Sequence, residues 1–162
     1  MKNTIMACAL FGSVFVSSAA WAQASVPNPD LTPGAINPQV TQENIQQTIC
    51  VRGWTATVRP DESYTEALKK EQIRQYGYSD YRLRDYEEDH LIPLALGGSP
   101  TSPKNLWPQP RHPQDGWTSD MKDKLEVRLS RLVCRGQLSL DAARSAIASD
   151  WRSAYRAYMA GE

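Results

Sequence analysis

The segment from Tyr86 to Pro108 restricts the possible folds more than any other part of the chain. The apolar run His90–Leu96 is followed by a Gly-Gly pair, a pattern typical of a strand that ends in a turn. Ser99–Lys104 contains two prolines and predicts a loop, after which Asn105-Leu-Trp begins a returning strand. We therefore expect a β-hairpin in the middle of the chain.

The last third of the chain predicts two amphipathic helices. Thr118 or Ser119 can cap the first helix and Gly136 ends it, while Ser139 caps the second. Prolines at 108, 110 and 113 predict irregular structure up to about residue 117. Apolar residues with helical spacing define the inner faces, namely Met121, Leu125, Leu129, Leu132 and Val133 in one helix, and Leu140, Ala143, Ile147, Trp151, Tyr155 and Tyr158 in the other.

The part of the chain before the hairpin predicts shorter elements. Thr41 can cap a short helix that runs to about residue 49, and the alternating, β-favouring residues Trp54–Val58 predict a short strand. A capping box that starts at Ser63 opens a helix that stops near Gly77, and a loop follows over 78–86. The fold class we expect is α+β, a single helix-rich domain.

The first 22 residues have the pattern of a secretory signal peptide. Lys2 precedes an apolar run over residues 5–16, and Ala-Trp-Ala at 20–22 forms a cleavage signal. We expect residues 1–22 to be removed, residues 23–40 to form a flexible leader, and residues 41–162 to form the domain. The run is too short to span a bilayer easily, so the mature protein is expected to be periplasmic or secreted, without a membrane span.

Two cysteines remain in the mature chain, Cys50 and Cys134. Because an exported protein meets an oxidising compartment, we expect a disulfide between them. A redox or metal-binding pair is the alternative, but the C-x-x-C spacing typical of such pairs is absent.

The charges are balanced overall but unevenly distributed. Residues 23–100 carry 7 basic and 11 acidic side chains, a net charge of −4, and residues 101–162 carry 10 basic and 7 acidic side chains, a net charge of +3. The mature sum of −1 differs from that of a strongly basic nucleic-acid binder, so any binding of nucleic acid has to use local charge.

Three residues of the hairpin segment could carry chemistry. Asp89 supplies a hard oxygen ligand for a divalent cation, and His90 can take a proton from water near neutral pH. Asn105 offers an amide oxygen to a metal, or a hydrogen bond that orients the histidine. In a purely structural interpretation, His90 hydrogen-bonds a backbone carbonyl and Asn105 caps a turn.

The order of Asp89-His90, an apolar segment, Gly-Gly and Asn105 resembles that of the HNH (ββα-metal) endonucleases. The likeness extends over residues 86–133. It implies a hairpin-plus-helix core around one divalent metal, with Asp89 as a metal ligand and His90 as the general base. Asn105 matches the central asparagine of the motif, which binds metal or steadies the hairpin. The implied cation is Mg²⁺, with Mn²⁺, Ca²⁺ or Ni²⁺ as alternatives.

The chain departs from that family at the third motif position. A His or Asn is expected about nine residues after the central asparagine, where this chain has Gln114. Asp123 on the following helix is our substitute metal ligand, and Lys122 could hold a phosphate instead. Arg82 and Arg84 are further candidates for binding substrate.

Two functions follow as hypotheses. The first is a metal-dependent endonuclease, a monomer that cleaves nucleic acid, DNA rather than RNA, with little sequence preference. The second is an exported HNH-like module that has lost catalysis and serves a binding or structural role in the cell envelope. Lys124, Arg128, Arg131 and Arg135 recur at helical spacing and either follow a phosphate backbone or form an ordinary polar face.

Overall fold

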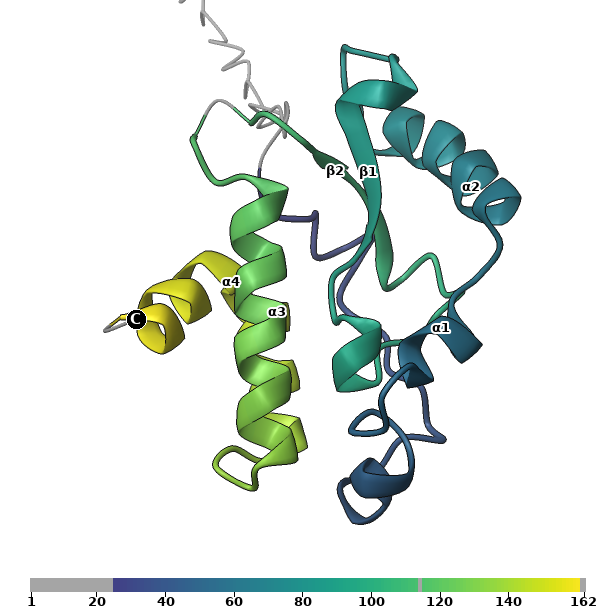
Figure 1. The fold of residues 1–162 in the computed structure, drawn as a ribbon. Helices are drawn as coiled ribbons and strands as arrows, with labels where there is room; N and C mark the ends of the chain where they lie inside the picture. The colour runs from purple at the N-terminus through teal and green to yellow at the C-terminus, as the bar shows by residue number, and fades with distance from the viewer. Residues whose placement is uncertain (1–24, 114, 161–162) are drawn as a thin grey trace, which may run out of the picture.

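The computed structural model describes residues 25–113 and 115–160, and it has an α+β fold. A two-stranded antiparallel sheet, made of β1 (Tyr86–His90) and β2 (Leu106–Pro110), lies between helices. The helix α2 (Glu62–Gln75) lies on one side of the strands, and α3 (Ser119–Cys134) and α4 (Leu140–Met159) lie on the other (Figure 1). The expected α+β class is confirmed at this level. No helix in the described ranges is long and apolar enough to cross a bilayer.

The hairpin is present, but its first strand lies earlier in the chain than expected. β1 starts within the predicted loop and ends at His90, and residues 94–96 form a 3₁₀ turn, η3, instead of a strand. The apolar residues of this stretch are buried in a compact loop, so their burial does not require an extended backbone. A Cβ on Gly98 would lie 1.8 Å from the carbonyl oxygen of Ile92, which shows how closely the loop closes on itself.

Irregular structure was expected at Pro108 and Pro110, but both prolines lie inside β2. The register of the two strands tolerates them. The bonds from Leu91 N to the Asn105 carbonyl and from Arg111 N to the Asp85 carbonyl place the odd-numbered residues of β2 at the hydrogen-bonded positions. Pro108 and Pro110 fall at the alternate positions, where the ladder needs no N–H donor.

The predicted strand at residues 54–58 is wrong, because these residues form the short helix α1 (Trp54–Val58). Gly53, with φ of 85°, turns the chain into it. Residues 54, 55 and 58 are half-buried while 56 and 57 are exposed, which is the pattern of one helical turn. Earlier in the chain, Thr41 precedes a 3₁₀ helix, η1 (Gln42–Gln47), at the place of the short helix predicted there.

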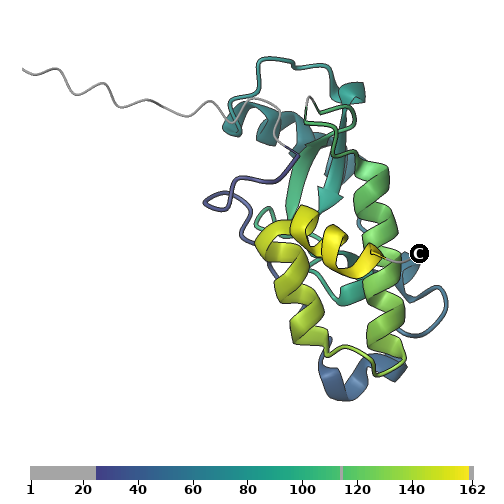
Figure 2. The same cartoon turned by 90° about the vertical axis from the view of Figure 1, so that its left-hand side faces the viewer.

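The two C-terminal helices agree with their sequence patterns. α3 begins at Ser119 and buries Leu125, Leu129 and Val133, and the Ser139 hydroxyl accepts a hydrogen bond from the Ala142 amide at the start of α4. α4 bends at Asp150, whose backbone leaves the helical conformation, so its last turns fold across α3 (Figure 2). These helices, with η1 and the loop after β1, enclose the larger of two apolar clusters. The other is largely aromatic and lies between α2 and the strands.

The disulfide between Cys50 and Cys134 is formed as expected, with 5.6 Å between its Cα atoms. It joins the segment after η1 to the last residue of α3. The predicted signal peptide, residues 1–22, lies outside the described residues. Residues 25–40, expected to belong to a flexible leader, lie against the domain. The Trp151 indole donates to the Ser25 carbonyl, Thr32 is fully buried, and residue 36 pairs with Gly98 in an isolated β-bridge.

Candidate functional site

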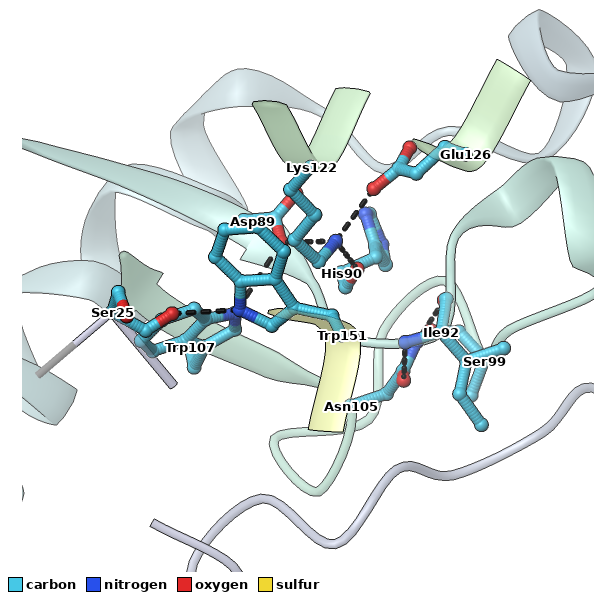
Figure 3. Close-up of polar contacts among 10 residues, drawn as sticks. All are labelled: Ser25, Asp89, His90, Ile92, Ser99, Asn105, Trp107, Lys122, Glu126 and Trp151. Carbon is cyan, nitrogen blue, oxygen red and sulfur yellow. Dashed lines mark hydrogen bonds and ion pairs between the residues drawn. The ribbon is translucent and has the colours of Figure 1, made fainter. Parts of the chain in front are cut away.

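The candidate site lies where the end of β1 meets the first half of α3. The side chain of Lys122 projects from α3 and is completely buried. Its ammonium donates to the Asp89 carboxylate at 2.7 Å, to the Glu126 carboxylate at 2.5 Å and to the backbone carbonyl of His90 at 2.8 Å (Figure 3). All three of its N–H donors are therefore in use. Lys122 was expected as a possible phosphate contact, but its ammonium binds three oxygens of the protein itself.

The charge state of this cluster follows from its burial. Burial alone would lower the pKa of Lys122, but Asp89 and Glu126 outweigh it and raise the pKa, so the ammonium keeps its proton. Burial raises the pKa of Glu126 to about 7, and the charge of Asp89 adds to this increase while Lys122 opposes it. Lys122 is thus the positive centre of an otherwise acidic junction between β1 and α3.

His90 is held in one orientation by the loop that follows β1. Its side chain is mostly buried, with the residue 7 % exposed, and its Nε2 lies 2.9 Å from the carbonyl oxygen of Pro100. Because a carbonyl oxygen can only accept, Nε2 carries the proton, and the neutral ring therefore has its lone pair on Nδ1. Burial is the main cause of a lowered pKa for His90, and the nearby charge of Arg59 contributes, so the ring is neutral at pH 7.

Asp89 and His90 face different partners, as neighbouring residues of a strand do. The Asp89 carboxylate bonds Lys122 and accepts from the Trp107 indole at 3.3 Å, whereas the imidazole of His90 bonds Pro100. The Asp89 carboxylate is therefore turned towards α3. In Figure 3 the Asp89 carboxylate and the His90 ring lie on opposite sides of the Lys122 ammonium.

Asn105 has the structural role that the hairpin requires. Its amide oxygen accepts from the Ile92 amide at 3.0 Å, and its amide nitrogen donates to the carbonyls of Ile92 and Ser99 at 3.0 Å each. The residue is fully buried. These bonds close the loop between the strands, so Asn105, expected as a metal ligand, uses its oxygen to hold the backbone that positions His90.

The other predicted site residues are spread over two places. Asp123 lies on the exposed side of α3, where partial desolvation by neighbouring atoms and then the charge of Asp89 raise its pKa, so it belongs to the acidic edge of the site. Arg82 pairs with Asp80 and Asp85 at 2.9 Å each, and Arg84 lies 3.9 Å from Asp85. Both arginines precede β1 and are therefore at the opposite end of this five-residue strand from His90. The structure does not bring them to the histidine.

The donor set does not fit the divalent metal that the resemblance implies. Lys122 already bonds the Asp89 carboxylate, and the amide oxygen of Asn105 is used within the loop. Within residues 25–113 and 115–160, no group of three or more His, Cys, Asp or Glu side chains could hold a metal ion. The Lys122 ammonium already engages the oxygens that a metal ion would need as ligands.

Two ionisable groups near the end of β1 were not among the predicted site residues. Arg59, the exposed residue that follows α1, carries a charge that acts on the imidazole of His90. Glu88 buries both carboxyl oxygens without a hydrogen-bond partner among the described residues. Burial, with a contribution from Asp89, raises the pKa of Glu88 to about 9, so the group is neutral at pH 7. Successive side chains of a strand point to opposite faces, and Glu88 directly precedes Asp89. This alternation could have placed Glu88 on the face of β1 away from α3.

The half-buried Trp117 is held by contacts with neighbouring side chains. Its ring makes edge contacts with Trp151 and Tyr155, and the guanidinium of Arg156 lies 4.8 Å from its centre. These contacts favour a packing role for the indole.

Comparison of the chain with family models, with curated proteins and with solved structures finds no match. The functional interpretation therefore depends on the geometry of the site.

Proposed function

We propose that this protein is an HNH-like nuclease that hydrolyses phosphodiester bonds in nucleic acid, with His90 as the general base. The observation that carries the proposal is the bond between Nε2 of His90 and the Pro100 carbonyl at the end of a hairpin that packs on a helix. This bond fixes the ring and leaves Nδ1 as the nitrogen that can accept a proton. Among the hydrogen bonds of the described residues, none involves Nδ1 of His90.

The chemistry needs one proton transfer at this nitrogen. A water molecule attacks the phosphorus and forms the new P–O bond while its proton moves to Nδ1 of His90. The bond to the leaving oxygen breaks, and that oxygen takes a proton from solvent. General-base catalysis of this kind contributes a factor of about 10²–10⁴ to the rate. A fixed, neutral imidazole suits this step because it is ready to accept the proton at pH 7.

The charges around the histidine suit an anionic substrate on one side only. At the edge facing α3 the carboxylates of Glu87, Asp89 and Asp123 interact with one another, and the nearby cations Arg111 and Lys122 are already paired with Glu87 and Asp89, so this edge would repel a phosphate. The charge of the exposed Arg59 acts on the imidazole of His90, and no ion pair within the described residues includes it, so we propose its guanidinium as the group that binds a phosphate oxygen. We place the scissile phosphate between Arg59 and Nδ1 of His90.

The surface of α3 offers a second place for the nucleic-acid backbone. Lys124, Arg128 and Arg131 line a hollow of about 340 Å³ that starts beside Asp123. Contacts between such positive side chains and phosphates carry no sequence information, which agrees with a nuclease of little sequence preference. The disulfide is compatible with an exported protein, and we propose the periplasm or the exterior of the cell as its location.

An envelope module without catalysis is the second candidate function, and one observation favours it. The ammonium of Lys122 is saturated by three protein oxygens and cannot bind a phosphate, so the cluster holds the fold together without needing a substrate. Hydrolysis by His90 distinguishes the two candidates.

The proposal predicts that the disulfide-bonded protein converts supercoiled plasmid to nicked and linear DNA. The assay uses plasmid and a single-stranded RNA, each with Mg²⁺ and with a chelator, over a range of pH. Because burial lowers the pKa of His90, the acid limb of the pH–rate profile should lie below the ordinary histidine pKa of about 6.5. Intact substrates under every condition would contradict the proposal and support the envelope module.

A further inference from the structure

The buried ammonium of Lys122 has the surroundings of a bound cation. Its three partners are two carboxylates and one backbone carbonyl. The Asp89 carboxylate and the His90 carbonyl belong to β1, and the Glu126 carboxylate lies one turn further along α3. Carboxylate and carbonyl oxygens are also the ligands preferred by Mg²⁺ and similar hard cations. The ammonium, like a metal ion, joins the strand to the helix through oxygen atoms.

The cluster is acidic enough to need such a cation. The Asp89 and Glu126 carboxylates both contact the buried ammonium, and Glu87 and Asp123 add negative potential at the edge of the junction, which Arg111 offsets in part through its ion pair with Glu87. A buried carboxylate without a compensating charge is strongly unfavourable, so removal of the positive centre would leave Asp89 poorly stabilised. Two further observations agree with this assignment, namely the complete burial of Lys122 and its full set of hydrogen bonds.

We infer that the ammonium of Lys122 takes the place of a divalent cation at the junction of β1 and α3, so that this cluster is a metal-free version of a cation site. The side chain is then a positioning residue. Through the backbone carbonyl of His90, it fixes the end of β1 against α3 and holds the histidine in place. The inference concerns the folded cluster and does not depend on the proposed nuclease activity.

The first test measures thermal unfolding and Mn²⁺ binding of the disulfide-bonded protein. We expect the wild type and Asp89→Asn to show the same difference in melting temperature between chelator and Mn²⁺. Electron paramagnetic resonance should detect no Mn²⁺ bound at Asp89. An increase with Mn²⁺ that disappears in Asp89→Asn would overturn the inference, because the wild-type cluster would then contain a metal ligand set.

The second test removes the ammonium. Lys122→Ala should melt at a lower temperature than the wild type, and Mn²⁺ should raise its melting temperature by about 4 °C or more, because the cation can bind the oxygens that the ammonium has left. The double variant Lys122→Ala/Asp89→Asn should not respond. Lys124→Ala, on the exposed face of the same helix, is the matched control and should behave as the wild type does.

Two results would contradict the assignment in this second test. One is a folded Lys122→Ala protein that melts at the wild-type temperature, and the other is a destabilised variant on which Mn²⁺ has no effect. If Lys122→Ala does not fold in either condition, the response of the wild type to Mn²⁺ decides the question. Since neither test measures cleavage, a protein without nuclease activity can still confirm this inference.

Discussion

Replacement of His90 by glutamine is expected to lower the rate of DNA cleavage by about 10²–10⁴-fold, the factor that a general base contributes. Glutamine keeps an N–H donor that can reach the Pro100 carbonyl, but it has no nitrogen that accepts a proton at neutral pH. The fold should therefore persist while catalysis is lost. The measurement is the initial rate of plasmid nicking, with thermal unfolding recorded for each variant.

The chain offers a matched control for this experiment. It contains only two histidines, and His112 is exposed and follows β2. We expect His112→Gln to cleave at the wild-type rate. Equal rates for His90→Gln and the wild type would show that the imidazole of His90 takes no part in the reaction.

Replacement of Glu88 by glutamine is expected to stabilise the protein at alkaline pH. Burial, and then the charge of Asp89, raise the pKa of Glu88 to about 9, while Lys69 acts in the opposite direction. Because the folded-state pKa lies above that of the unfolded chain, the folded protein binds the proton more tightly. The contribution of this group to stability is fully present below about pH 4.5 and is lost as the pH rises towards 9.

The size of this effect follows from linkage. One proton difference changes the free energy of unfolding by about 1.4 kcal/mol per pH unit, so between about pH 6 and pH 8 the wild type should lose on the order of 3 kcal/mol more than Glu88→Gln. Urea unfolding at the two pH values measures the difference, and the exposed Glu62→Gln serves as control. A constant difference between wild type and Glu88→Gln across this range would mean that Glu88 is ionised in the folded protein.

Local signals predicted the helices at the end of the chain and the disulfide. The apolar spacing of Leu125, Leu129 and Val133 fixes the buried face of α3, and Ser139 caps α4 through its own side chain. These features depend on residues close together in sequence, which explains why the pattern was sufficient. The disulfide needed only two cysteines and an expected oxidising compartment.

The limits of β1 could not be predicted from composition. Its residues include three consecutive acidic side chains, whose extended form depends on pairing with a strand about 20 residues later. The apolar residues after His90 are buried by contacts with η1, α3 and α4, so they form a loop in spite of their strand-like composition. Tertiary contacts decided both outcomes.

The role of Lys122 shows what sequence reasoning could have found. Lys122 precedes Leu125 by three residues and Leu129 by seven, so it lies on the buried face of the helix. A lysine at such a position has to meet an acidic partner, and Asp89 was already identified as a candidate site residue. The choice of Asp89 as partner, and the consequence for a metal, depend on the packing of α3 against β1 and were not visible in the sequence.

The protonation state of His90 is the most direct test of the proposed site. Nitrogen-15 NMR of the histidine rings can distinguish the two neutral tautomers, and a pH titration with a phosphorothioate oligonucleotide shows which nitrogen the substrate approaches. We predict that Nε2 carries the proton at pH 7, that the pKa lies below its ordinary value of about 6.5, and that the oligonucleotide shifts the Nδ1 signal. A proton on Nδ1, or an Nδ1 signal that the oligonucleotide leaves unchanged, would contradict the assignment of His90 as the general base.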